Sequence, residues 1–416
     1  MCLLCLAVAT SISCAQVAPR AIAPPKTTEI RGVWLTNVSS AVLFTPWGVN
    51  RALNQLAQLN FNTVYPVVWN RGSTFYPSAV AKKVTGRDCD IWLQVLRFRQ
   101  DSLAQIIKQS HRQGLRVIPW FEYGFMAPPS SALAKRHPDW LTARRDRSKL
   151  FQSGGNDPNL PEASNPKLAK VDTPVVGQGL WLNPFHPEVQ QFILDLIVEV
   201  VTKYDIDGIQ LDDHFGLPNE FGYDAFTIGQ YQQEHQGKIP PSNPVDSEWL
   251  RWRADKLTKF MQRVYQAVKA VKPNCLVTLS PNPQYYAYRA TLQDWQRWVQ
   301  LGLVEELVCQ VYRSDRQAFL AELQQSALQL ARQKIPVGIG ILTGSLSQPV
   351  AIEQIQKQVQ LVRDRGYSGV SFFYWESLWG YIAPESPQER RDVFKSLFVP
   401  SKPKAKPSKS DASSRS

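Results

Sequence analysis

The sequence predicts an α/β protein built as a (β/α)8 barrel, the TIM-barrel fold. Short runs of β-branched and aromatic residues alternate with longer stretches of helical periodicity, which is typical of βα units around a parallel sheet. The chain contains eight such runs, and their spacing fits one closed barrel. An open doubly wound sheet shows the same alternation. Neither a GxGxxG nor a GxxxxGK[ST] motif is present, so a nucleotide-binding fold of that kind has no support.

The elements follow one another in a regular order. We expect strands at Arg31–Asn37, Asn62–Trp69, Leu115–Tyr123, Ile206–Asp213, Cys275–Ser280, Leu307–Tyr312, Pro336–Leu342 and Gly369–Trp375. We expect helices at Val49–Leu59, Ser102–Arg112, Pro187–Tyr204, Glu248–Val271, Leu292–Leu301, Ala318–Gln333, Ala351–Arg365 and Gln388–Leu397. Gly114, Gly302 and Gly366 follow helical stretches and mark their ends.

The predicted barrel domain covers residues 29–398, and two of its connections are long. They run from Gly124 to Asn183 after the third strand and from His214 to Ser247 after the fourth. Both leave the carboxyl ends of strands, where TIM-barrel active sites form. Long loops at this edge indicate a binding site.

The two ends of the chain differ in composition from the barrel. Residues 1–15 form a short apolar run that resembles an export signal, with Cys14 as a candidate for lipidation, and residues 16–28 form a proline-rich linker. Residues 399–416 form a basic tail that we expect to be disordered. We therefore expect an exported protein that is periplasmic, extracellular or attached to the cell envelope through its leader or tail.

Composition limits the class of protein. The chain is 44% hydrophobic and 20% charged, which excludes wholesale disorder, and its net charge of +12 favours an anionic partner such as an acidic polysaccharide. Nucleic acid is not expected, because no recognised binding motif accompanies the charge. The cysteines show neither CxxC nor Cys/His spacing, so we predict no metal site and no cofactor.

The strongest candidate for catalysis lies at the end of the fourth predicted strand. Alternation along that strand directs Gln210 and Asp212 into the barrel, and Asp213 and His214 follow at the corner. A carboxylate at this rim has no packing role, so we expect Asp212 to be catalytic. Asp213 is a second catalytic candidate, either as the proton donor or as a structural acid like a helix N-cap.

Other strand ends supply further polar and aromatic residues at the same level. Glycoside hydrolysis needs two carboxyl groups, and Glu122 and Glu376 are the predicted partners of the aspartate pair. We also expect Arg71 and Arg313 to be available for a carboxylate on an acidic sugar. The remaining candidate residues for substrate binding are Asn37, Trp69, Trp120, Gln210, His214, Ser280, Asn282, Gln310, Tyr312 and Trp375.

These residues occur in segments that resemble the glycosyl hydrolase-like 10 family, (β/α)8-barrel proteins of bacterial envelopes. The matching segments are Glu29–Asn37, Phe61–Tyr65, Tyr76–Ser78, Asp207–Asp213 and Leu279–Pro281. The resemblance implies a hydrolase of glycosidic bonds in a polysaccharide, for example a cell-envelope glycan such as peptidoglycan.

The chain also departs from the family pattern. His214 follows the aspartate pair where an aromatic residue is common, and Arg313 stands where a tryptophan is expected. The seventh strand ends in Leu342-Thr343-Gly344 without a carboxylate.

Two other functions remain open from the sequence. A metal-dependent polysaccharide deacetylase could use Asp212, Asp213 and His214 as ligands, although no His-x3-His pair accompanies them. A glycan-binding protein without catalytic activity would retain the same groove.

Overall fold

The computed structural model describes residues 29–151, 179–345, 349–379 and 383–398. The predicted leader, linker and basic tail lie outside the described residues.

Eight parallel strand positions close into a barrel, as the sequence predicts. The strand β1 pairs with both β2 and β12, and this double pairing joins the two edges of the sheet. The barrel strands are β1 (Ile30–Leu35), β2 (Thr63–Asn70), β4 (Arg116–Val117) with β5 (Trp120–Phe121), β8 (Gly208–Asp212), β9 (Leu276–Ser280), β10 (Glu306–Gln310), β11 (Val337–Leu342) and β12 (Gly369–Phe373). The short strand β3 (Ser73–Thr74) extends β2 as a hairpin, and β6 (Met126–Ala127) pairs with β7 (Leu180–Trp181).

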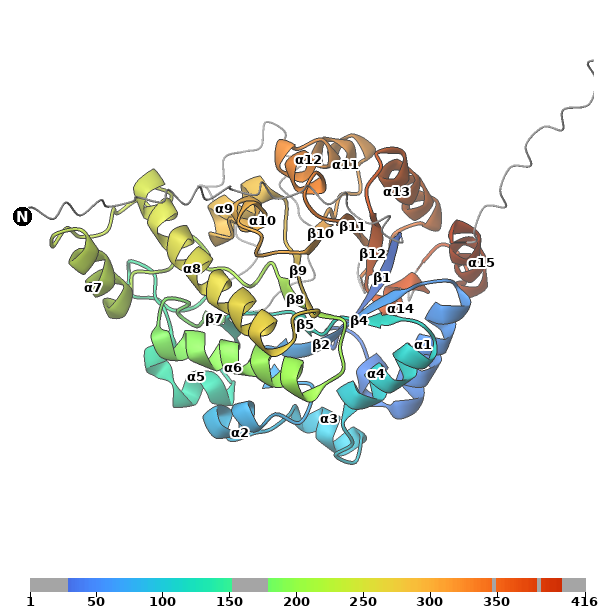
Figure 1. Cartoon of the computed structure of the whole chain (residues 1–416), viewed down its shortest axis with the longest axis horizontal. Coiled ribbons are helices and arrows are strands. Elements are labelled where there is room, and N and C mark those ends of the chain that lie inside the picture. The colour runs from blue at the N-terminus through green and yellow to red at the C-terminus, as the bar shows by residue number, and fades with distance from the viewer. Residues whose placement is uncertain (1–28, 152–178, 346–348, 380–382, 399–416) are drawn as a thin grey trace, which may run out of the picture.

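Helices surround these strands, as Figure 1 shows. Their bounds are α1 (Pro46–Gln58), α2 (Ala79–Thr85), α3 (Ile91–Leu96), α4 (Ser102–Arg112), α5 (Ala132–Arg136), α6 (Pro187–Lys203), α7 (Ala225–Glu234), α8 (Ser247–Val271), α9 (Gln284–Thr291), α10 (Trp295–Gln300), α11 (Arg316–Leu323), α12 (Ser326–Arg332), α13 (Ile352–Asp364), α14 (Trp375–Leu378) and α15 (Pro387–Leu397). Two short 3-10 helices, η1 (Val42–Phe44) and η2 (Pro138–Trp140), complete the described elements.

The helix α4 illustrates why these segments fold as they do. Asp101 caps its first turn by accepting a hydrogen bond from the N–H of Ala104. Leu103, Ile106, Ile107 and Ser110 are buried, and their spacing places them on one face of the helix. This face covers the strands, so the core consists of the barrel interior and the layer between strands and helices.

Several predicted boundaries were wrong. The predicted strand Gly369–Trp375 ends at Phe373, and Trp375 begins α14. The third strand consists of two short pieces, β4 and β5, since Pro119 between them has no N–H for the sheet. The predicted helix Ala318–Gln333 is divided into α11 and α12, because Gln325 adopts an extended backbone. The predicted helix Leu292–Leu301 is shorter, and α9 precedes it without having been predicted.

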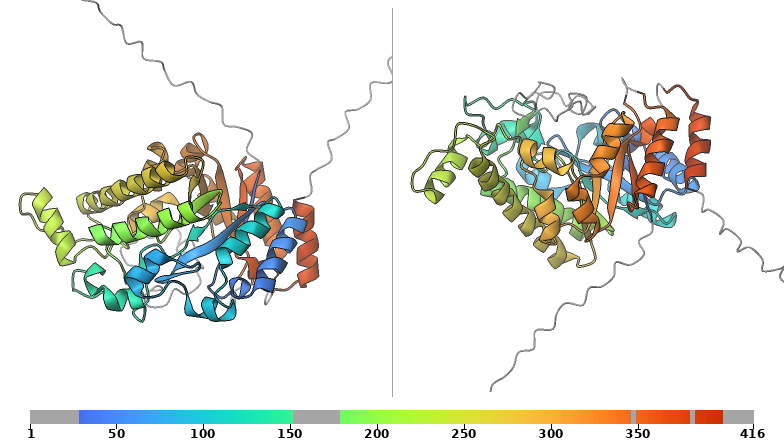
Figure 2. Two further views of the ribbon diagram at one scale, coloured as in Figure 1. Left: turned by 60° about the horizontal axis from the view of Figure 1, so that its bottom comes forward. Right: turned by 90° about the horizontal axis from the view of Figure 1, so that it is seen from above.

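The two long connections contain their own elements. The described part of the first holds β6, α5, η2 and β7, and the second holds α7, which lies at the periphery of the molecule in both views of Figure 2. Within the described residues, no helix combines the length and the apolar character that crossing a membrane requires.

Candidate active site at the carboxyl ends of the strands

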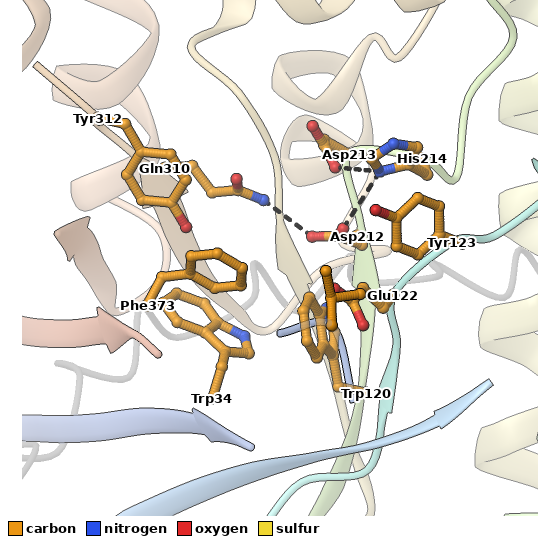
Figure 3. A pocket seen from close by; sticks show the side chains of 11 residues that line it. Trp34, Trp120, Glu122, Tyr123, Asp212, Asp213, His214, Gln310, Tyr312 and Phe373 are labelled. Carbon is orange, nitrogen blue, oxygen red and sulfur yellow. Dashed lines mark hydrogen bonds and ion pairs between the residues drawn. The ribbon is translucent and has the colours of Figure 1, made fainter. Parts of the chain in front are cut away.

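A small pocket opens among side chains from the carboxyl ends of five barrel strands. The close view in Figure 3 shows Asp212 near its centre, with Trp34, Trp120, Tyr312 and Phe373 as aromatic walls. The remaining lining residues are Val38, Glu122, Tyr123, Asp213, His214 and Gln310. The free space is about 40 Å³, which holds a few water molecules. These side chains therefore form a floor on which a larger ligand would rest.

Asp212 is fixed by two donors from neighbouring strands. Its register partner Ser280 donates a hydrogen bond to Oδ1 at 2.8 Å, and Gln310 Nε2 donates to the same oxygen at 2.8 Å. The residue is only 3% exposed. Burial and the neighbouring Asp213 carboxylate raise the pKa of Asp212 well above its ordinary value. Asp212 is thus oriented toward the pocket and favours its protonated form.

Asp213 has the opposite protonation preference. Its Oδ1 lies 2.7 Å from His214 Nδ1, and its Oδ2 accepts a hydrogen bond from Asn282 Nδ2 at 2.7 Å. Burial opposes ionisation, but the His214 cation and these hydrogen bonds outweigh it and lower the pKa of Asp213 below its ordinary value. Burial also opposes the charge on His214, yet the Asp213 carboxylate raises the pKa of His214 to about 10. Asp213 and His214 therefore form an ion pair at neutral pH.

The His214 ring is held between two aromatic side chains. The centre of its ring lies 4.5 Å from that of Tyr123 and 5.9 Å from that of Trp181, which stacks nearly parallel. The backbone around Gly124 approaches closely, since a Cβ there would lie 2.3 Å from the His214 carbonyl oxygen. Glycine is required at this position by the contact and by its φ of +29°.

Glu122 also lines the pocket. Thr36 Oγ1 donates to its carboxylate at 3.0 Å, and Asn70 Nδ2 donates to Oε2 at 2.6 Å. Asn70 also donates to Asn37 Oδ1 at 2.7 Å, which places the predicted binding residue Asn37 beside this group. Burial raises the pKa of Glu122 to about 7, against the effect of these hydrogen bonds. Its protonation state therefore changes near neutral pH.

The structure brings most of the predicted site residues together. Trp120 and Tyr312 line the pocket, and Gln210 accepts a hydrogen bond from Trp34 Nε1 at 2.7 Å beneath it. Ser280, Asn282 and Gln310 hold the aspartate pair. Asn70 was expected among the strand-end residues but not as a site residue, and sequence reasoning missed Thr36 and Tyr123, which lie beside the predicted residues Asn37 and Glu122.

Glu376 was wrongly predicted as a pocket carboxylate. It belongs to α14, and its Oε1 accepts hydrogen bonds from Ser40 Oγ and from the N–H groups of Ala41 and Val42, both at 3.1 Å. The side chain thus fixes the loop after β1. Trp375 lies on the same helix, buried and outside the pocket, with the Arg51 guanidinium 5.9 Å from its ring centre.

Trp69 and Arg313 also differ from expectation, whereas Arg71 lies beside the pocket. Trp69 is fully buried, packs edge-on against Phe192 of α6 and donates to the Gly124 carbonyl, so no sugar can stack on it. Arg313 pairs with Glu322 at 2.7 Å. Arg71 lies outside the pocket, with its guanidinium 5.1 Å from the Tyr123 ring centre.

Asp212, Asp213 and His214 are also the residues that could hold a metal ion, because one ligand atom from each lies within 4.8 Å of the others. The donors are already engaged, however. The His214 nitrogen that faces the carboxylates is hydrogen-bonded to Asp213, and Oδ1 of Asp212 accepts two hydrogen bonds. The arrangement fits an ion-paired proton-transfer site better than a metal centre.

A closed (β/α)8 barrel with a buried carboxyl cluster at the carboxyl ends of its strands places this chain among the glycoside-hydrolase-like barrels. The family comparison is more specific: residues 29–362 match the model of the glycosyl hydrolase-like 10 family, and the chain belongs to that family.

Similar proteins agree with this assignment. The chain is 24% identical to "Glycosyl hydrolase YngK" of Bacillus subtilis over 69% of its own length and 54% of that protein, so it spans about half of this relative. It is 24% identical to "Glycosyl hydrolase DigH" of Escherichia coli over 84% of its own length and 82% of that protein.

Solved structures support the fold. The glycoside hydrolase domain of PgaB (BpsB) from Bordetella bronchiseptica superposes with a TM-score of 0.59 at 14% identity, covering 88% of this chain and 99% of that one. The catalytic domain of a β-amylase from Paenibacillus polymyxa gives 0.55 at 11% identity, covering 90% of this chain and 100% of that one.

Proposed function

We propose that this protein hydrolyses glycosidic bonds in a cell-envelope polysaccharide, such as the glycan strands of peptidoglycan. The observation that carries the proposal is the pair Asp212 and Asp213, a buried carboxyl group and an adjacent half-buried one, whose pKa values are driven in opposite directions. In glycosidases, two carboxyl groups with different pKa values take different roles: one is protonated and acts as the acid, and the other is ionised. The family to which the chain belongs favours the same reaction.

In this proposal Asp212 is the proton donor. Its raised pKa keeps a proton available near neutral pH. Ser280 and Gln310 bind Oδ1, so Oδ2, which lies 3.5 Å from His214 Nδ1, is the oxygen that transfers the proton to the leaving group. Asp213 stays ionised because of His214, and its charge both keeps Asp212 protonated and stabilises positive charge developing on the sugar.

Glu122 completes the proposed set of groups. It lines the same pocket, and in its ionised form it is the carboxylate placed to accept a proton from water. The aromatic rings of Trp120 and Tyr312 offer flat apolar surfaces for the sugar above this floor. We also propose, from the predicted leader and basic tail, that the protein is exported and works at the envelope.

The test is to incubate the purified protein with peptide-free glycan strands and to measure new reducing ends. We expect the parent protein to produce them, Asp212→Asn to lose at least about a thousandfold in rate, and Glu376→Gln, a buried carboxylate outside the pocket, to remain active. Binding of the strands with no new ends from any variant would favour a glycan-binding protein instead. Release of acetate without chain cleavage would favour a deacetylase.

A further inference from the structure

A second and larger cavity lies beside the candidate active site. Its free volume is about 350 Å³, and its walls come from the β2–β3 hairpin, the segment around α2 and the start of the first long connection. Three cationic side chains line it, Arg71, Arg87 and Lys135, and no Asp or Glu does. Arg71 is half-buried, whereas Arg87 and Lys135 are exposed to solvent, so the cavity wall is positive.

None of these three cations forms an ion pair within 4.0 Å of a carboxylate among the described residues, although the charge of Arg71 also acts on the Glu122 carboxyl of the catalytic pocket. Arg313, the other arginine that the sequence suggests for a carboxylate, is by contrast already paired with Glu322. Like charges gathered around one cavity repel one another, and a bound anion relieves that repulsion. The hydroxyls of Ser73 and Ser130, which also line the cavity, add hydrogen-bond donors.

Arg71 connects this cavity to the active site. It lies in the two-residue turn after β2, where its φ of +50° and that of Gly72 at +75° form a tight hairpin. Its guanidinium rests over Tyr123, which lines the catalytic pocket, while Arg71 itself lines the cavity. The cavity and the catalytic pocket are thus neighbours, separated by the Arg71–Tyr123 contact.

We infer that this cavity, lined by Arg71, Arg87 and Lys135, binds a carboxylate carried by the glycan substrate. The inference rests on the proposed function in one respect, that a glycan occupies the neighbouring pocket. A planar guanidinium accepts a carboxylate through two parallel hydrogen bonds, and the added ammonium and hydroxyl groups fix its position. The site selects acidic glycans and places their chain relative to Asp212.

The experiment compares two forms of one ligand. Peptide-free peptidoglycan strands carry a lactyl carboxylate on alternate sugars, and reduction of these carboxyls replaces each carboxylate by a neutral hydroxymethyl group. Binding of both strand forms is measured by calorimetry on the inactive Asp212→Asn protein. The same measurement is then made on two variants of that protein, one with Arg71→Gln and one with both Arg87→Gln and Lys135→Gln. Lys82→Gln with Lys83→Gln is the matched control, since both lysines are exposed on α2 and outside the cavity.

We expect the cavity variants to weaken binding of the carboxylate strands by about tenfold or more and to leave binding of the reduced strands unchanged. The control pair should change neither. Equal binding of the two strand forms, or an equal loss in the control, overturns the inference. The experiment measures binding and not cleavage. If the protein binds the carboxylate strands more tightly than the reduced strands but never cleaves them, the proposed hydrolysis is wrong and the carboxylate site stands.

Discussion

Replacing Asp213 by Asn should lower the pKa of His214 from about 10 toward its ordinary 6.5, because Asp213 is the larger cause of the rise and Asp212, at 3.5 Å from Nδ1, is the smaller one that remains. The contact of 2.7 Å between Oδ1 and Nδ1 gives an attraction of about 6 kcal/mol at an effective dielectric constant of about 20. The rise from 6.5 to about 10 corresponds to about 5 kcal/mol. The shift corresponds to slightly less energy than the attraction, because burial of the ring disfavours the charged imidazole and opposes part of the attraction.

The assay is the titration of the imidazole signals by NMR, with His214→Gln identifying the His214 signal among the five histidines. Asp207→Asn is the matched control, because Asp207 contacts His111 at 3.0 Å and should leave His214 unaffected. A wild-type His214 that titrates near 6.5, or an unchanged pKa in Asp213→Asn, would refute the reasoning.

The same pair affects stability in a defined pH range. The folded-state pKa of His214 lies above its unfolded value, so the stabilisation is complete below about pH 6.5 and disappears as the pH rises through about 10. Urea unfolding should therefore show a larger loss in Asp213→Asn at pH 6 than at pH 10.

Three further predictions separate structural residues from reacting ones. Glu376→Ala should lower the free energy of unfolding by about 2 to 3 kcal/mol through loss of its hydrogen bonds to the loop after β1, without reducing kcat; a large fall in kcat with normal stability would return Glu376 to the active site. Trp69→Ala should cost about 3 to 5 kcal/mol in urea unfolding and leave the KM for glycan unchanged, because the ring is buried against α6; a raised KM at normal stability would contradict this. Burial raises the pKa of Glu122 from 4.5 to about 7, so ionisation of Glu122 destabilises the folded protein as the pH rises through that range. Between pH 4 and pH 8 the free energy of unfolding of Glu122→Gln should therefore rise by up to about 3 kcal/mol relative to that of the wild type. Equal pH dependence of stability in the two proteins would exclude the raised pKa.

Much of the fold could be predicted from the sequence because the barrel repeats one simple unit. Alternation along β8 placed Gln210 and Asp212 inside the barrel, where Trp34 and Gln310 contact them. The break in the third strand could not be placed from the sequence. Whether Pro119 interrupts the sheet depends on which residues of the neighbouring strands lie beside it.

The candidate site was only partly predictable for a similar reason. Trp69 lies near the end of β2, and the sequence suggested that Glu376 closes the last strand, although it lies in α14. The direction of each side chain depends on local backbone geometry. The first turns toward α6 and the second toward the loop after β1. Glu122 accepts hydrogen bonds from Thr36 and Asn70, which belong to the ends of two other strands. The spacing of these residues along the chain does not show that they are in contact.

The most direct test of the central claim is to digest glycan strands in water labelled with heavy oxygen and to analyse the products by mass spectrometry. Hydrolysis with Asp212 as proton donor predicts one labelled oxygen at each new reducing end with the parent protein, and none with Asp212→Asn. Unlabelled cleavage products, labelled acetate without cleavage, or equal labelling by the Asp212→Asn variant would contradict it.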